Sequence, residues 1–156
     1  MTADEVVEIP NHEGMVDYGR LFAKVMRAGD VVLLHGDLGA GKTTLTQGIA
    51  AGLHVAEEIQ SPTFAIVAEH DGKDAEGAPI RLYHLDLYRL ENPEHLEGLG
   101  YEQFIEPVNG ISVIEWPERA GDWLPDRFWL LRIAYGGSGA RTIHRSWHGR
   151  GDGSAV

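Results

Sequence analysis

A glycine-rich segment at residues 36–44 constrains the fold of this chain more than any other feature. It reads Gly-Asp-Leu-Gly-Ala-Gly-Lys-Thr-Thr and matches the pattern G-x-x-x-x-G-K-[ST] in full. The short apolar run Val31–Leu34 precedes it and is typical of a strand buried on both faces. A helical pattern from Thr43 to Ala51 follows and closes at Gly52. A strand, a glycine-rich turn and a helix in this order predict a phosphate-binding loop, called the P-loop below.

Each fixed residue of the P-loop has a physical role. Gly36 lets the chain turn off the strand, while Gly39 and Gly41 can adopt backbone angles that other residues avoid. Successive backbone N–H groups then point at the anion, helped by the positive end of the following helix. Lys42 is expected beside the β- and γ-phosphates, and Thr43 is expected to offer its hydroxyl to Mg²⁺. The predicted nucleotide-binding residues of the loop are Asp37, Leu38, Gly39, Ala40, Gly41, Lys42, Thr43 and Thr44.

The rest of the chain alternates short apolar runs with amphipathic segments. A helix is expected over His12–Ala28, with Asn11 as its N-cap. The polar segment Asp71–Pro79 is too short for a crossover helix, so it predicts a hairpin. The expected strands are Val6–Ile9, Val31–Leu34, Phe64–Glu69, Ile80–Leu87, Ile111–Ile114, Phe128–Tyr135 and Thr142–Trp147. This pattern predicts an α/β fold of the P-loop NTPase class, with a mixed sheet, antiparallel hairpins and flanking helices. We expect one domain over residues 1–148 and a disordered tail at 149–156.

Composition excludes several function classes. The 156 residues suit one domain, and 13 Lys and Arg against 24 Asp and Glu give a formal net charge of −11. Such an acidic protein is a poor candidate for gripping nucleic acid over a broad surface. The absence of cysteine excludes disulfides, thiolate metal sites and a cysteine nucleophile. No secretion signal and no apolar run of about 20 residues is present, so we expect a cytoplasmic protein without a membrane association.

Two acidic residues at expected strand ends are candidates for the Mg²⁺ and hydrolysis chemistry that a P-loop alone does not supply. Glu115 closes the apolar run Ile111–Ile114, and Asp86 lies near the end of another apolar segment. Aspartate is uncommon inside an apolar strand, because an unpaired buried carboxylate is costly. The alternatives are an ion pair of Asp86 with Arg89 or Arg81, and a simple surface acid at Glu115.

The segment Ser61-Pro62-Thr63 is a third candidate. A hydroxyl pair around a rigid proline could form a loop that senses the nucleotide, with Thr63 reaching Mg²⁺ or the γ-phosphate. A turn before the next strand is the commoner use of Ser-Pro. Both interpretations stay open on residue chemistry alone.

Four segments in this order resemble the TsaE (YjeE) family of bacterial ATPases. They are Gly36–Thr44, Ser61–Phe64, His84–Leu90 and Ile114–Glu118, and the resemblance extends from about Ile9 to His144. It implies a role in the threonylcarbamoyl modification of the adenosine beside the anticodon of certain tRNAs (t6A). It also implies work with the TsaD and TsaB proteins, with ATP hydrolysis keeping their complex turning over. The tRNA would then be held mainly by the partner complex.

The resemblance also assigns roles to single residues. It implies that Lys42 holds phosphate, that Thr43 and Glu115 are the Mg²⁺ positions and that Asp86 is needed for hydrolysis. Thr63 would belong to a switch-like loop, so the catalytic set is Asp86, Lys42 and Thr63.

Further positions are implied by the same resemblance. Trp116 looks like the family's tryptophan beside the Mg²⁺ carboxylate. Two pairs of residues, at the start of the first helix and in the late turn, look like places that hold the base: Asn11, His12, Ala140 and Arg141.

Three other functions remain open. A small-molecule kinase would use the same P-loop, but it usually needs an arginine-bearing lid, and the chain has no arginine cluster. A regulatory GTPase usually selects guanine with an N-K-x-D motif, and none of Lys24, Lys42 and Lys73 lies in one. A nucleotide-dependent assembly factor with negligible hydrolysis would share the site and differ only in turnover.

Overall fold

The computed structural model describes residues 4–60 and 66–149. These residues form a seven-stranded mixed sheet with the order β1-β7-β6-β2-β5-β4-β3. The strands are β1 (Glu5–Ile9), β2 (Val31–His35), β3 (Val67–Lys73), β4 (Pro79–Asp86), β5 (Gly110–Glu115), β6 (Phe128–Tyr135) and β7 (Arg141–His148). The α-helices are α1 (His12–Ala23), α2 (Lys42–Gly52) and α3 (Glu102–Ile105). Short 3₁₀ helices are η1 (Pro93–Leu99), η2 (Pro117–Ala120) and η3 (Gly137–Gly139).

The centre of the sheet is parallel and its two sides are antiparallel. Strand β2 pairs in parallel with β5 and β6, and β4 pairs in parallel with β5. The β3–β4, β6–β7 and β1–β7 pairs are antiparallel. The predicted mixed sheet with antiparallel hairpins and flanking helices is therefore confirmed. The carboxyl ends of the parallel strands meet at one edge, which is where ligands bind in open α/β sheets.

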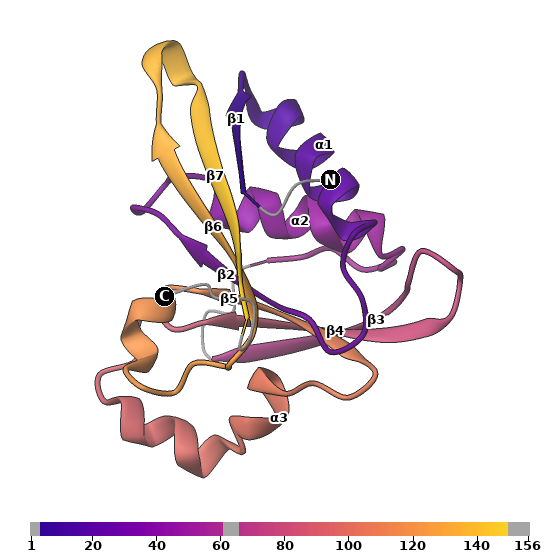
Figure 1. Ribbon diagram of the computed structural model, residues 1–156, viewed down its shortest axis with the longest axis vertical. Coiled ribbons are helices and arrows are strands. Elements are labelled where there is room, and N and C mark those ends of the chain that lie inside the picture. Colours follow the sequence, from indigo (N-terminus) through magenta and orange to yellow (C-terminus); the bar gives the residue numbers. More distant parts are fainter. Residues whose placement is uncertain (1–3, 61–65, 150–156) are drawn as a thin grey trace.

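Helices cover both faces of the sheet. Figure 1 shows α1 and α2 on one side and the segment with α3 on the other. Alternate residues of β2 face the two sides: Val32 and Leu34 join the core beneath α1 and α2, whereas Val31 and Leu33 join the opposite core. All residues of β5 are buried. The apolar run Val31–Leu34, which predicted a strand buried on both faces, thus lies at the centre of the sheet.

Glycines let α1 and α2 pack with their backbones in contact. A Cβ atom added at Gly48 of α2 would lie 2.3 Å from the carbonyl oxygen of Val16 in α1. A Cβ atom added at Gly19 of α1 would lie 2.7 Å from the amide nitrogen of Ile49 in α2. Because α2 begins at the P-loop, this contact fixes the loop's position relative to α1.

The first helix is shorter than its apolar spacing predicts. The prediction of a helix to Ala28 is wrong, because α1 ends at Ala23 and the chain continues through turns. Met26 is nevertheless buried in the core under the helices. The apolar spacing therefore predicted the burial of Met26 correctly. It did not predict the length of the helix, because turns can bury an apolar side chain as well as a helix can. Gly29, at φ +98°, lies in this turn region.

The β3–β4 hairpin extends further into the polar segment than expected. Strand β3 continues to Lys73, which pairs with Pro79 of β4. The Asp74 carboxylate then accepts hydrogen bonds from the backbone N–H groups of Glu76 and Ala78, each at 2.9 Å. Ladder hydrogen bonds at a sheet edge do not require apolar side chains, which is why the apolar pattern ended this strand too early, at Glu69. Phe64, its expected start, lies outside the described residues.

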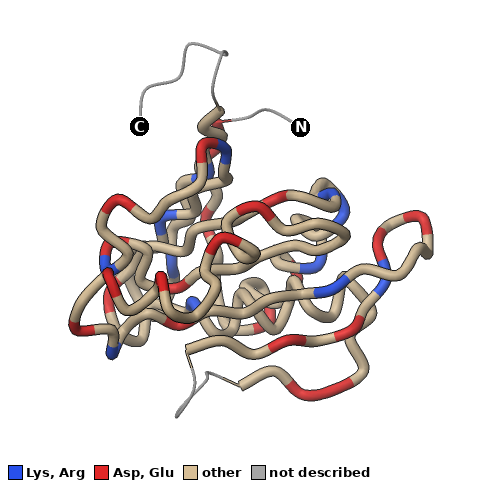
Figure 2. Tube along the Cα trace, turned by 90° about the horizontal axis from the view of Figure 1, so that it is seen from below, with Lys and Arg blue, Asp and Glu red and all other residues tan. Residues whose placement is uncertain are grey.

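The charge of the chain is distributed over its surface. Figure 2 shows Asp and Glu positions along most of the trace, with Lys and Arg positions interspersed.

Across residues 4–60 and 66–149, no helix has the length and apolar character needed to cross a membrane. The expected single domain over 1–148 stays a prediction, and the expected tail at 149–156 lies outside the described residues except for Gly149.

Candidate functional site

The P-loop connects β2 to α2 and takes the backbone shape for which its glycines are suited. Gly39 has φ +80° and Gly41 has φ +115°, both in the left-handed region that side chains disfavour. Gly41 is also the N-cap residue of α2. The first amides of α2 therefore face the loop, as an anion site requires.

The Lys42 side chain folds back along the loop. Its Nζ donates hydrogen bonds to the carbonyl oxygens of Gly36 and Asp37, the latter at 3.0 Å. The ammonium also lies 3.9 Å from the centre of the Trp116 ring, in a cation–π contact. Burial lowers the pKa of Lys42, while nearby carboxylates, Glu115 foremost, act in the opposite direction. A partly dehydrated cation in this position is suited to an anionic ligand.

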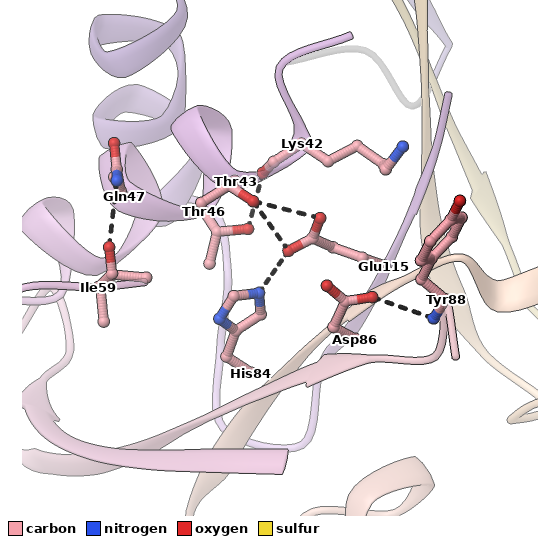
Figure 3. Close-up of polar contacts among 9 residues, drawn as sticks. All are labelled: Lys42, Thr43, Thr46, Gln47, Ile59, His84, Asp86, Tyr88 and Glu115. Atoms are coloured by element: carbon pink, nitrogen blue, oxygen red, sulfur yellow. Dashed lines mark hydrogen bonds and ion pairs between the residues drawn. The ribbon is translucent and has the colours of Figure 1, made fainter. Parts of the chain in front are cut away.

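Glu115 contacts two other elements from the end of β5. The Thr43 hydroxyl at the start of α2 lies 3.5 Å from each oxygen of the Glu115 carboxylate. Nε2 of His84 in β4 lies 2.5 Å from Oε2 of the same carboxylate (Figure 3). Only 2% of Glu115 is exposed, so the alternative of a simple surface acid is wrong.

Asp86 lies beside Glu115, since the two are register partners in the parallel β4–β5 pair. Its Oδ1 accepts a hydrogen bond of 3.0 Å from the backbone N–H of Tyr88. Burial raises the pKa of Asp86, and the Tyr88 hydrogen bond opposes this. A raised pKa makes a carboxylate a better proton acceptor near neutral pH.

The alternative partner Arg81 is engaged elsewhere. Its guanidinium forms ion pairs with acids of the neighbouring strand β3, at 3.7 Å from Glu69 and 3.3 Å from Asp71. These contacts lie at the far end of β4 from Asp86. The structural ion pair between Asp86 and Arg81 is therefore not formed.

A cavity of about 260 Å³ opens between the P-loop and the carboxyl ends of β4 and β5. Its walls include Lys42, Thr43, Asp86, Glu115 and Trp116. A hydroxyl and two carboxylates are hard oxygen donors of the kind that Mg²⁺ prefers, and the lysine and loop amides suit phosphate. The residues present therefore fit a magnesium–phosphate group.

Trp116 adopts a conformation that is unusual for a large side chain. Its φ of +59° lies in the left-handed region, directly after Glu115. Its ring packs against Tyr88, with a centroid distance of 4.9 Å, as well as against Lys42. Strained backbone of this kind persists where surrounding contacts hold it, which is common at functional sites.

A second cavity of about 330 Å³ adjoins the P-loop. It is lined by Asn11, His12 and Arg141, and it shares Gly39, Gly41 and Thr44 with the first cavity. Three of the four residues that the resemblance assigns to the base thus meet beside the loop. The fourth, Ala140, is adjacent in the chain but does not line this cavity.

The end of the β6–β7 hairpin forms hydrogen bonds to the P-loop, and the sequence did not predict these contacts. Arg141 Nε donates to the carbonyl of Ala40 at 3.1 Å, and its guanidinium lies 4.4 Å from the Tyr135 ring centre. The Tyr135 hydroxyl donates to the carbonyl of Leu38 at 2.8 Å. No local sequence pattern signals these contacts, because the partners are about one hundred positions apart.

Two further positions complete the comparison with the sequence predictions. Thr63 and its neighbours lie outside the described residues. The chain reaches them from Ile59, whose carbonyl accepts a hydrogen bond of 3.1 Å from the Gln47 side chain of α2 (Figure 3).

His84 was also missed as a single residue. Its place two residues before Asp86, on the same face of a strand, was the available signal.

Comparison with known proteins connects this site to one family. Residues 9–143 match the family model described as "Threonylcarbamoyl adenosine biosynthesis protein TsaE". A protein of Nostoc sp. named "tRNA threonylcarbamoyladenosine biosynthesis protein TsaE" is 43% identical, over 90% of this chain and 86% of the relative. A Haemophilus influenzae protein of the same name is 37% identical, over 81% and 80%. The crystal structure of YdiB from Bacillus subtilis superposes with a TM-score of 0.72 at 29% identity, covering 94% of this chain and 87% of YdiB.

Proposed function

The chain belongs to the TsaE family, and from this premise we propose that it is a Mg²⁺-dependent ATPase of t6A biosynthesis on tRNA. The observation that carries the proposal is the convergence of three separate segments on one cavity. Lys42 and Thr43 come from the P-loop helix, Asp86 from β4 and Glu115 from β5. Such a set combines phosphate binding, metal ligands and a proton acceptor, which are the parts that phosphoryl transfer to water needs.

ATP would lie across the P-loop. The loop amides and Lys42 would bind the phosphates, aided by the N-terminus of α2. The base would enter the second cavity beside Asn11, His12, Ala140 and Arg141. The two cavities share residues of the loop, which supports one nucleotide extending from one to the other.

Thr43 and Glu115 would hold Mg²⁺, together with oxygens of the nucleotide. Mg²⁺ keeps several of its waters and is usually bound by one or two protein oxygens plus phosphate, which matches this donor set. When bound, the ion supplies positive charge next to the phosphate oxygens.

Hydrolysis would use the remaining groups of the cavity. Asp86 would accept a proton from the attacking water as its oxygen bonds to the γ-phosphorus. The bond from the γ-phosphorus to the β–γ bridging oxygen then breaks, giving ADP and phosphate. Lys42 would stabilise the charge on the transferred group. Thr63 is proposed to sense the γ-phosphate, as part of a switch-like loop.

The cellular role would be carried out with partners. We infer that ATP hydrolysis supports turnover of a TsaD–TsaB complex in the cytoplasm. The formal net charge of −11 favours tRNA binding by that complex rather than by this chain alone.

The test is ATP hydrolysis by the purified protein, alone and with a TsaB–TsaD complex. We expect slow hydrolysis alone and strong stimulation by the complex. Lys42→Ala should abolish both, whereas Lys24→Ala, at an exposed position far from the P-loop in sequence, should change neither. ATP binding without hydrolysis in either condition would instead support an assembly factor. Preference for GTP, or transfer of phosphate to a small acceptor, would support the switch or kinase alternatives.

A further inference from the structure

The His84–Glu115 contact is the shortest polar contact that the structure gives the Glu115 carboxylate. His84 Nε2 lies 2.5 Å from Glu115 Oε2, whereas the Thr43 hydroxyl lies 3.5 Å from either oxygen. His84 is fully buried and Glu115 is 2% exposed. Figure 3 shows the imidazole on the side of Glu115 that lies away from Lys42. The histidine therefore lies behind the carboxylate rather than in the ligand cavity, and it is absent from that cavity's walls.

We propose that His84 is the positioning residue of the magnesium site, holding the Glu115 carboxylate toward Thr43 through a hydrogen bond from its Nε2–H. The proposal rests on the Mg²⁺–nucleotide function proposed above. A glutamate ends in a broad torsion between an sp³ and an sp² carbon, so its carboxylate plane is weakly defined by its own rotamer. A donor behind one oxygen defines that plane, and such outer contacts tune metal binding about 10–100-fold.

The strand arrangement explains how His84 reaches Glu115. His84 and Asp86 lie on the same face of β4, because side chains alternate along a strand. The parallel register places Asp86 opposite Glu115. Asp86 therefore lies at the cavity wall, while His84, one pleat further back, reaches Glu115 from the interior.

The proposal implies one position for the proton of this contact. A carboxylate that binds Mg²⁺ is ionised and can only accept a hydrogen bond, so the proposal places the proton on Nε2. His84 Nδ1 is buried and has no hydrogen-bond partner within residues 4–60 and 66–149. A neutral imidazole with a bare Nδ1 leaves no buried N–H donor unsatisfied. The proposed tautomer is thus the one that the surroundings of both nitrogens favour.

The test compares two amides of different length at position 84. In His84→Gln the amide nitrogen reaches about as far as Nε2, and in His84→Asn it stops near the position of Nδ1. The measurement is calorimetric affinity for a non-hydrolysable ATP analogue, in EDTA and across a Mg²⁺ titration. We expect His84→Asn to raise the half-saturating Mg²⁺ concentration about 10–100-fold and to leave affinity in EDTA unchanged. His84→Gln should keep the wild-type Mg²⁺ dependence.

Other outcomes would overturn the proposal. Equal Mg²⁺ dependence of the wild type and both variants would exclude the positioning role of His84 but leave the proposed magnesium function intact. An equal loss of affinity for the ATP analogue with and without Mg²⁺ in His84→Asn would also exclude this role, because it would indicate general damage to the nucleotide site. A wild type whose affinity is the same in EDTA and in Mg²⁺ would remove the magnesium function itself.

A measurement on the unaltered protein reports the tautomer directly, and His84→Gln is needed only to assign the resonances. The imidazole ¹⁵N resonances of His84, assigned by their loss in His84→Gln, should show a protonated Nε2 and a bare Nδ1. They should shift when Mg²⁺ is added to the nucleotide complex. A protonated Nδ1 with a bare Nε2, or no response to Mg²⁺, would contradict the proposal.

Discussion

The hydroxyl of Tyr135 donates a hydrogen bond of 2.8 Å to the carbonyl oxygen of Leu38, 97 positions earlier in the chain. This bond joins the end of β6 to the middle of the P-loop. Arg141, from the paired strand β7, donates a further hydrogen bond from its Nε to the carbonyl oxygen of Ala40 in the same loop. The antiparallel hairpin therefore takes part in shaping the phosphate-binding loop, although it contributes no residue of the G-x-x-x-x-G-K-[ST] pattern.

Removing the Tyr135 hydroxyl should weaken nucleotide binding. Tyr135→Phe keeps the ring under Arg141 but frees the Leu38 carbonyl, so the loop becomes less well ordered before binding. A single hydrogen bond contributes about 0.5–1.5 kcal/mol, which corresponds to an affinity loss of roughly two- to tenfold. Calorimetry with ADP checks this. The matched control is Tyr101→Phe, whose hydroxyl has no hydrogen-bond partner in the described part of the chain; equal affinities of the two variants would contradict the prediction.

Replacing Asp86 should separate binding from hydrolysis. Asp86→Asn keeps an acceptor for the Tyr88 amide but is a far weaker proton acceptor. General base catalysis typically contributes about 10²–10⁴-fold, so ATP turnover should fall by about that factor, with ATP affinity within about threefold of the wild type. Steady-state turnover and equilibrium binding measure the two effects. Asp71→Asn, on exposed β3, is the control. An active Asp86→Asn protein would show that another group accepts the proton.

A methyl group at the α1–α2 contact should destabilise the protein. In Gly48→Ala the new Cβ would meet the Val16 carbonyl at 2.3 Å, so the helices must separate. Overpacking typically costs about 1–3 kcal/mol, or roughly 2–4 °C of Tm per kcal/mol in a chain of this size. Thermal unfolding measures the change. Gly98→Ala is the control, since nothing lies within 4 Å of its added Cβ. The close packing would be disproved by two equal Tm values.

The half-buried carboxyl of Asp30 should make stability depend on pH. Burial raises its pKa above the ordinary 3.8, so the folded state binds the proton more tightly than the unfolded state. Stability contributed by Asp30 therefore falls as the pH rises from 3.8 through the raised pKa. Asp30→Asn keeps an acceptor for the Arg27 amide without the charge. It should be more stable than the wild type at neutral pH.

The advantage of Asp30→Asn should disappear as the pH falls below 3.8, because the carboxyl is then protonated in both states. Urea unfolding at several pH values measures it. The exposed Asp122→Asn serves as a control and should show no comparable gain at neutral pH. A constant advantage of Asp30→Asn at every pH would mean that something other than proton binding causes it.

Features that depend on residues close together in the chain could be predicted from the sequence. The P-loop and the start of α2 could be predicted because glycines, backbone amides and the lysine act within a few positions of one another. The buried strands β2 and β5 followed from continuous apolar runs. Local patterns were weaker at element ends: α1 stops at Ala23 because turns can bury Met26 as well as a helix can. Asp86 and Glu115 were found as candidates because each ends a strand.

The contacts between these groups depend on how the whole chain folds. The pairing of Glu115 with His84 depends on the parallel register of β4 and β5, which places residues 31 positions apart in contact. The Tyr135–Leu38 bond depends on β6 lying beside β2 in the strand order. Neither is encoded in a local pattern, because strand order and register result from the packing of the whole sheet. The chemistry of the residues was therefore readable along the chain, and their positions relative to one another were established by folding.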